Sequence, residues 1–270
     1  MSALRKMAAF IKKDFLIYTS YRFAFILNLL SIVFTMANFY FAAKIFGQGP
    51  VPYLKEYQTG YFSFVVIGLA LSAYLYTALH SFSGNIRQEQ IIGTLEAMLV
   101  TPTKTPIIII ALSLWDFIFT SITAVAYLLF GALFFKMDLS HMNLLAALII
   151  IILTIICFSS IGMISASFIM VFKKGDPVDW LIAGFSGFFG GVFFPVELLP
   201  QAVRAVSYLI PITYSLRALR HALLQGYSCK VLMPDMGMLL LFCIILLPLG
   251  IWMFKYAVKR AKVDGSLAYY

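Results

Sequence analysis

Six long apolar stretches alternate with short polar segments along this chain. A helix needs about 20 apolar residues to cross the hydrocarbon core of a bilayer, and each stretch is close to or above that length. We therefore expect an all-α polytopic membrane protein, with six transmembrane helices in a single domain over residues 23–270. The expected spans are Phe23–Ile45, Gly60–Phe82, Pro106–Phe135, Asn143–Phe172, Trp180–Val196 and Met236–Tyr256.

The first 22 residues have a different pattern, in which apolar residues recur every three or four positions. The basic residues lie mostly elsewhere on the helical wheel, so this segment is amphipathic. Such helices lie at the boundary between lipid head groups and acyl chains. We expect an interfacial helix over residues 1–22, and the alternative is a charged flank of the first span. The apolar positions are Leu4, Met7, Ala8, Ile11, Phe15 and Tyr18, and the basic ones are Arg5, Lys6, Lys12 and Lys13.

A second amphipathic segment separates the second and third spans, over about residues 83–102. Ser83 or Asn85 can cap a helix there, and Pro102 ends it. The helix would carry an apolar stripe beside a charged one, which suits docking in the groove of a partner. A surface helix resting on lipid is an equally good interpretation. The apolar stripe is Ile91, Leu95, Met98 and Leu99, and the charged residues are Arg87, Glu89 and Glu96.

The connection between the fifth and sixth spans is too apolar for a free loop. Its pattern predicts two short helices, Ala202–Leu209 and Tyr214–Leu224, separated by Pro211. We expect residues 197–226 to dip back into the outer leaflet as a re-entrant segment. Arg217 and Arg220 share one helical face, where they would snorkel to water, hold lipid phosphates or pair with an acid such as Glu197.

Composition and charge narrow the class of protein. Of the 270 residues, 62% are hydrophobic and 11% are charged, whereas soluble domains carry about 25% charged residues, so no separate soluble catalytic domain fits. The net charge of +9 does not indicate nucleic acid, because the basic residues flank the apolar runs. Thirteen of the 20 Lys and Arg lie on the side of the N-terminus and seven on the other, which predicts that both termini are cytoplasmic.

Few residues inside the spans can do chemistry. Asp116 is the acid well inside a predicted span, and it serves either proton coupling or a structural bond to a neighbouring helix. The chain has no Gly-Lys dipeptide and therefore no phosphate-binding loop, and it has no His-Glu-x-x-His metal motif. Gly187 and Gly191 form a Gly-x-x-x-Gly pair, which indicates helix packing within one subunit or between two.

Two ordered motifs resemble a known family. The run Arg87–Glu96 followed by Thr101-Pro102, and the later Gly190–Pro195 with Pro211-Ile-Thr-Tyr214, are similar to the permease subunit of type-2 ABC exporters. This resemblance implies a cytoplasmic coupling helix that binds a separate ATPase subunit. It implies two permease copies, as a homodimer or heterodimer, and two ATPase copies that bind ATP and Mg²⁺, with no cofactor on this chain. The coupling residues would be Arg87, Glu89, Gly93, Thr94, Leu95 and Glu96.

The family further implies export, through a prokaryotic-type inner or plasma membrane, of an amphipathic, lipidic, glycolipid or drug-like substrate. The alternatives are a secondary transporter or channel without an ATPase, which would show repeated interrupted helices, and an intramembrane enzyme, which would show converging catalytic residues. By the family's geometry, the substrate pathway would include Phe34, Tyr40, Phe64, Tyr74, Phe185 and Phe189, and the outer gate Glu197, Arg204, Arg217 and Arg220.

Overall fold

The computed structural model describes the chain apart from residues 1–2, 47–53, 55–56, 58, 102, 104, 173–176 and 264–270. The described part consists of helices and turns, which confirms the all-α prediction. Its α-helices are α1 (Ala3–Ser20), α2 (Arg22–Phe46), α3 (Tyr61–Ile92), α4 (Thr94–Val100), α5 (Thr105–Phe135), α6 (Leu144–Phe172), α7 (Pro177–Phe189), α8 (Gln201–Ser207), α9 (Pro211–Leu224) and α10 (Met233–Val263). A short 3-10 helix, η2 (Val196–Leu198), precedes α8.

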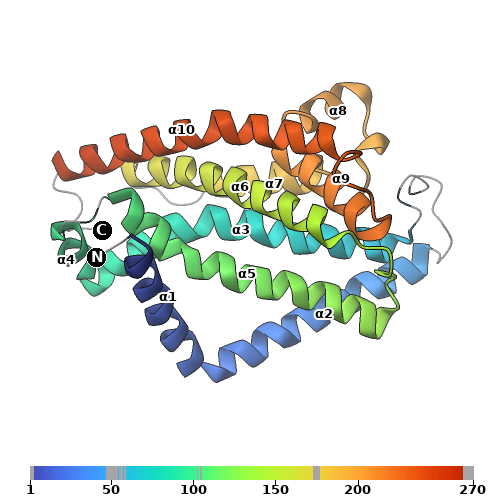
Figure 1. The fold of residues 1–270 in the computed structure, drawn as a ribbon, viewed down its shortest axis with the longest axis horizontal. Coiled ribbons are helices and arrows are strands. Elements are labelled where there is room, and N and C mark those ends of the chain that lie inside the picture. The colour runs from blue at the N-terminus through green and yellow to red at the C-terminus, as the bar shows by residue number, and fades with distance from the viewer. Residues whose placement is uncertain are drawn as a thin grey trace.

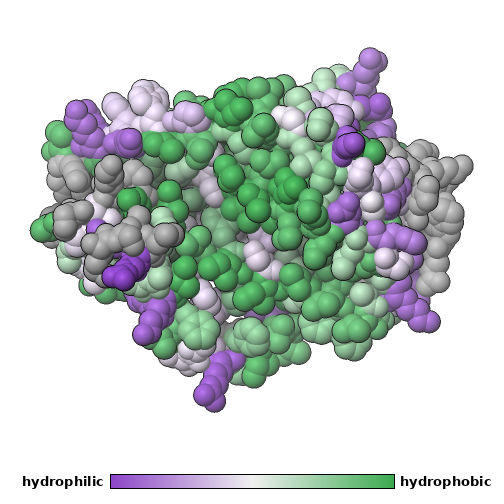
Figure 2. Space-filling model, viewed as in Figure 1, coloured by the Kyte–Doolittle hydropathy of each residue, from purple (hydrophilic) through white to green (hydrophobic). Residues whose placement is uncertain are grey.

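The long helices run along one axis of the molecule (Figure 1). Helix α3 lies in the middle and packs against α5, α6 and α9, while α10 packs along α6. Helices α1 and α4 and the last turns of α10 lie at one end, and α8 and α9 lie towards the other. Figure 2 shows an apolar band around the middle of the visible face and hydrophilic side chains at both ends, as a membrane-spanning bundle requires.

Five helices are long and apolar enough to cross a bilayer: α2, α3, α5, α6 and α10. They match five of the six expected spans. The expected span Trp180–Val196 is instead the 13-residue α7, about 20 Å long, which is short of a hydrocarbon core of about 30 Å. A tight turn follows α7, and Gly191 adopts the left-handed φ of 83° there. The six-span count is therefore not confirmed.

The segment between the second and third spans differs from the prediction. Ser83 and Asn85 do not cap a new helix, because both lie inside α3, which continues from the second span to Ile92. The Asn85 side chain bonds to Asp116 of α5 instead of to the backbone of its own first turn. Only the seven residues of α4 form a separate helix. Span two and most of the expected coupling helix are thus one rigid element.

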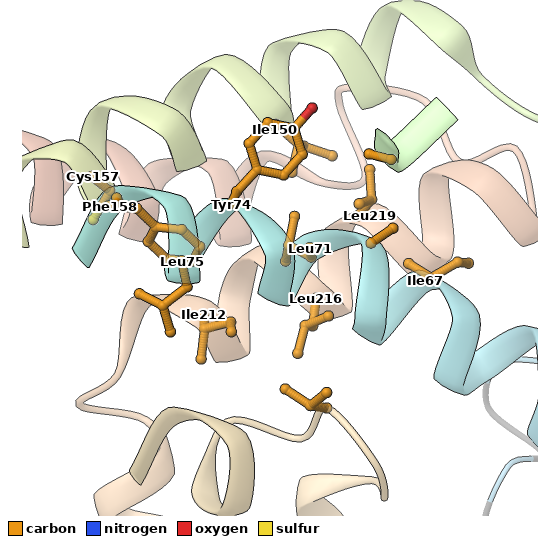
Figure 3. Close-up of a cluster of buried hydrophobic side chains, with 14 of the residues drawn as sticks. Ile67, Leu71, Tyr74, Leu75, Ile150, Cys157, Phe158, Ile212, Leu216 and Leu219 are labelled. Carbon is orange, nitrogen blue, oxygen red and sulfur yellow. The ribbon is translucent and has the colours of Figure 1, made fainter. Parts of the chain in front are cut away.

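The buried core lies where α3, α6 and α9 meet (Figure 3). Helix α6 approaches α3 very closely at Gly162, where a Cβ atom would lie 1.9 Å from the carbonyl oxygen of Ala78. Helix α9 is buried along almost its whole length, although it is too short to span a membrane. The core side chains labelled in Figure 3 are Ile67, Leu71, Tyr74 and Leu75 of α3, Ile150, Cys157 and Phe158 of α6, and Ile212, Leu216 and Leu219 of α9.

The two short helices expected after the fifth span are present as α8 and α9. Pro211 begins α9, because its fixed φ suits the first turn of a helix and its missing N–H has no partner to lose there. The expected N-terminal helix is also present, as α1. The interfacial position of α1 and the re-entry of residues 197–226 into the outer leaflet stay predictions.

Candidate functional site

The end of the bundle that carries α4 is organised by a turn at Gly93. This residue has φ 81° and ψ 10°, a left-handed conformation that glycine adopts without the steric cost of a Cβ atom. No other group lies within 4 Å of the position a Cβ would take, so the backbone conformation and not crowding is what requires glycine. The turn ends α3 at Ile92 and lets α4 begin at Thr94 in a new direction.

Three side chains join α1, α3 and α4 in a contact that we call the clasp: Lys13, Glu89 and Thr94. The Lys13 Nζ atom donates to Oε1 of Glu89 at 2.6 Å. The Thr94 hydroxyl donates to the other carboxylate oxygen, Oε2. The Glu89 side chain is only 8% exposed and that of Lys13 is 39% exposed. A charged hydrogen bond in this setting is stronger than one between exposed side chains.

The charges around the clasp keep Lys13 protonated. Burial of its ammonium group lowers the pKa of Lys13, but the hydrogen bond to Glu89 and the nearby carboxylates of Asp14 and Glu89 outweigh it, so the pKa lies above the ordinary lysine value. The Asp14 carboxylate is 3.3 Å from the same Nζ atom. Lys13 is therefore a cation shared between α1 and α3 at neutral pH.

Helix α1 also bonds to the segment that follows α4. The Lys6 Nζ atom donates to the hydroxyl of Thr103 at 2.6 Å, just beyond the end of α4. Two aromatic contacts fix α1 to α5: the rings of Phe15 and Trp115 lie 5.6 Å apart, and those of Tyr18 and Phe119 lie 4.5 Å apart. The short helix α4 thus lies between two bonds from α1, and α1 itself is packed on the bundle.

Two of the six expected coupling residues, Gly93 and Thr94, form the turn and part of the clasp described above. Glu89 is buried and its carboxylate bonds to Lys13 and Thr94, so it does not stand on the surface of a separate helix, and its role in coupling stays a prediction. Arg87 is exposed, and the side chains of Leu95 and Glu96 lie outside the described residues. Three large apolar side chains at this end are strongly exposed: Ile91 (69%), Ile92 (59%) and Val100 (86%). We call these three the inner apolar patch.

A series of hydrogen-bonded polar side chains, which we call the polar ladder, joins α3 to α5. Its members are Tyr74, Thr77, Ser81 and Asn85 of α3 and Asp116, Thr120 and Ser121 of α5. The members nearest the clasp along α3 surround Asp116, whose carboxylate accepts hydrogen bonds from the Ser81 hydroxyl and the Asn85 amide. The amide of Asn85 also donates to the carbonyl oxygen of Leu112. This is the bond to a neighbouring helix that was one of the two interpretations of Asp116. Further along, Thr77 pairs with Thr120 at 2.6 Å, and Tyr74 donates to Ser121 at 3.0 Å.

Arg220 is the largest fully buried side chain towards the opposite end of the bundle. It is 2% exposed and donates to the carbonyl oxygens of Gly191 at 2.9 Å, Val192 at 3.0 Å and Phe64 at 3.1 Å. The guanidinium carbon lies 3.3 Å from the centroid of the Phe64 ring. Arg220 therefore ties α9 to the start of α3 and to the turn after α7, and the prediction that it snorkels to water is wrong.

The other expected outer residues make different contacts. Arg217 pairs with Asp235 of α10 through its Nε and Nη2 atoms, not with Glu197. Arg204 donates to the backbone carbonyl oxygens of Glu197 and Leu199, which closes the loop at η2. Arginine suits such sites because its planar guanidinium carries five donors. These bonds make residues 197–224 a firmly held part of the fold.

The six residues expected to line a substrate pathway do not come together within this chain. Phe64 and Tyr74 are buried in the core, and Phe189 is half-buried against Phe185. Phe34 and Phe185 are exposed on α2 and α7, at 73% and 49%. Tyr40 lines a cavity between the ends of α2, α3 and α5.

The Gly-x-x-x-Gly pair does not lie on one helix, because α7 ends at Phe189 and Gly191 belongs to the turn. A Cβ at Gly187 would meet only the Phe193 ring, at 4.0 Å. Packing within the subunit therefore does not require Gly187, which corrects one of the two interpretations of the pair. A Cβ at Gly191 would lie 2.8 Å from the Val196 side chain, in addition to its left-handed φ.

Several bonds of this protein had no local signal in the sequence. Lys13 and Glu89 are 76 residues apart, and each looks like an ordinary charge on an amphipathic helix. Asp179 seemed to belong to a polar connection, yet it is 1% exposed and accepts a hydrogen bond from Ser165 of α6. An acid beside an apolar run is the one feature that could have marked Asp179, since burying a carboxylate requires a partner.

Comparison with known proteins agrees with this architecture. The model of the ABC-2 type transporter family matches residues 6–224, from α1 to the end of α9. The inner membrane transport permease YadH of Escherichia coli strain K12 is 27% identical over 191 residues, which cover 68% of this chain and 71% of the relative. The same-named permease of Shigella flexneri gives the same values. The chain therefore belongs to the ABC-2 type transporter family, as a multi-pass inner membrane permease that is the membrane subunit of an ABC transporter.

Proposed function

We propose that this permease is the transmembrane half of an ATP-driven exporter whose ATPase subunits bind the α3–α4 end, on the cytoplasmic side. ATP and Mg²⁺ then bind to the partner, because this chain has no phosphate-binding loop. The observation that carries the proposal is that the clasp and the inner apolar patch occur at the same end of the bundle. One holds α4 to the bundle, and the other offers an uncovered surface to a partner.

The inner apolar patch has the properties of a docking surface. Ile91 and Ile92 end α3 and Val100 ends α4, so the patch spans both sides of the Gly93 turn. Isolated exposed apolar residues are common, but three large ones around a short helix, beside the exposed Arg87, are suited to insertion in a groove. They lie at the end of the bundle where Figure 1 shows α4.

The clasp supplies a route for motion. When ATP closes the partner subunits, a force on α4 acts on Glu89 through Thr94 and on Lys13 of α1 through Glu89. Since Glu89 lies on the same continuous helix as the polar ladder, α3 carries the displacement towards α5. The nucleotide dependence comes from the partner, because a ligand shifts an equilibrium only by its differential affinity for the two states.

The substrate pathway in this proposal lies between two permease copies and not inside one. Helices α2 and α7 leave aromatic side chains exposed, among them Phe34, Trp180 and Phe185. A pathway bordered by aromatic residues, with few charges, favours an amphipathic or lipidic substrate over an ion. The export direction and the two-copy assembly rest on the family resemblance.

Co-purification tests the proposal. We expect the tagged wild-type permease, expressed with its neighbouring genes, to purify with an ATP-binding subunit. The double variant I91D/I92D should lose that subunit while it still melts near the wild-type temperature, because both side chains are exposed. The matched control is V231D, which places a charge on an equally exposed apolar residue at the other end of the bundle. Retention of the ATPase by I91D/I92D, or its absence from the wild type, would refute the proposal.

A further inference from the structure

A cavity of about 520 Å³ opens between the ends of α2, α3 and α5, at the opposite end of the bundle from α4. Pockets of this size accommodate the polar part of a small organic ligand. Three aromatic rings pack against one another along its wall: Tyr40 and Phe135 lie 4.8 Å apart, and Phe62 and Phe135 lie 4.9 Å apart. No residue of the clasp, the polar ladder or the inner apolar patch contributes to it.

Two lysines and one aspartate also line the cavity. The Lys44 Nζ atom lies 5.0 Å from the centroid of the Tyr40 ring, and among the described residues neither Lys44 nor Lys136 forms an ion pair. Asp138 is engaged by its own turn, where Ser140 donates to its carboxylate and holds the pKa of Asp138 below its ordinary value. The described lining thus carries two cations and one anion, a net positive charge suited to an anionic ligand.

The backbone at Lys136 gives an independent reason to expect a ligand. Lys136 follows the last residue of α5 with φ 54°, and the amide of Met137 bonds back to the carbonyl of Gly131 at 3.0 Å. This is the helix-ending motif in which glycine is usual and a side chain is strained. Among the described residues, Lys136 is the single non-glycine residue that has a positive φ. Because strain of this kind is concentrated at functional positions, we take the Lys136 side chain as a group that would contact the ligand.

The cavity lies where head groups would meet acyl chains. Phe134, which lines it, is 68% exposed on α5, and Phe41 of α2 is 61% exposed nearby in the chain. In the view of Figure 2 the apolar band gives way to hydrophilic side chains towards this end. We propose that the cavity binds the phosphate-bearing head group of an anionic phospholipid, with Lys44 and Lys136 contacting the phosphate oxygens and the aromatic wall packing on the glycerol and first methylenes.

The position of Lys136 allows a variant that separates charge from folding. In K136G the cation is lost but the left-handed backbone becomes favourable, so the melting temperature should equal or exceed that of the wild type. K136R keeps both the charge and the strain. K44Q and K44R test the second lysine in the same way, and K230Q removes an exposed lysine that does not line the cavity.

Native mass spectrometry of the detergent-purified protein, titrated with phosphatidylglycerol, measures the binding. We expect K136G and K44Q each to weaken it about fivefold, and K136R, K44R and K230Q to retain it. Wild-type binding by either K136G or K44Q would overturn the proposal. Displacement of the lipid by an equal concentration of inorganic phosphate would show a site for a free anion and would overturn the assignment to a lipid.

Discussion

Replacement of Gly162 by alanine tests the closest approach between two long helices. The side chain added to α6 would point at the backbone of α3, with its Cβ 1.9 Å from the carbonyl oxygen of Ala78 and 2.7 Å from the carbonyl carbon. Cβ atoms in real structures essentially never approach a neighbour below 3.0 Å. The obstructing atoms belong to a backbone, which cannot rotate away as a side chain could, so α3 and α6 must separate by about 1 Å.

The energetic consequence follows from this displacement. Forcing one extra methyl group into a packed interface costs about 1–3 kcal/mol. A radial gap of about 0.5–1 Å also removes about a quarter to a half of the dispersion energy of the contacts along α3 and α6. Alanine recovers about 1 kcal/mol through its helix propensity. The expected net destabilisation is about 2 kcal/mol, or a melting temperature about 5 °C lower.

Thermal unfolding of the detergent-purified protein, followed by tryptophan fluorescence, gives the measurement. The matched control is G84A, because Gly84 is an exposed glycine within α3 and has no neighbouring atom within 4 Å of a Cβ. Only the propensity gain applies there, so G84A should melt about 2 °C higher than the wild type. A G162A variant that melts at or above the wild-type temperature, or a G84A variant that loses as much as G162A, would show that α3 and α6 are not in this close contact.

Three further predictions concern the polar contacts. R220M leaves three backbone carbonyls without their buried donor, so it should cost about 3 kcal/mol or more in the same melting assay; a loss below 1 kcal/mol would contradict the bonding described here. D116A should cost about 2 kcal/mol because the Asn85 amide loses its acceptor, whereas D116N should retain most stability and ATPase-driven transport; abolished transport in D116N would favour the proton-coupling role instead. K13A, E89A and their double variant should show a coupling energy of about 1 kcal/mol in a double-mutant cycle, and strictly additive losses would disprove the clasp.

The spans were predictable because hydrophobicity acts locally. Helices α2, α5 and α6 begin and end within one residue of the expected boundaries, since apolar runs bounded by polar residues need no tertiary information. Helix α7 was predicted to be too long because Val192 to Phe194 are as apolar as a span, although the Gly190-Gly191 pair turns the chain before them. The apolar composition predicts that a helix lies in this segment, but the glycine turn decides where α7 ends.

The contacts of polar side chains were much harder to predict. Asn85 is a good helix cap by residue type, but in the fold it bonds to Asp116, which comes 31 residues later. Arg220 looks like a snorkelling residue, and its role as a donor to three carbonyls depends on the turn after α7 lying next to α3. Such bonds depend on how the helices are arranged. A single sequence shows which donors and acceptors are present but does not show which of them lie close together in the fold.

In the proposed mechanism, motion of α4 reaches the transmembrane helices through the clasp. Hydrogen–deuterium exchange of the purified permease–ATPase complex, with and without Mg²⁺ and a non-hydrolysable ATP analogue, tests this claim without knowledge of the substrate. In the wild type, nucleotide should change exchange in α4, in α1 and in the part of α5 around Asp116. In E89A the change should be confined to α4. Equal nucleotide-dependent changes in α1 and α5 of wild type and E89A would show that the clasp does not transmit the motion of α4.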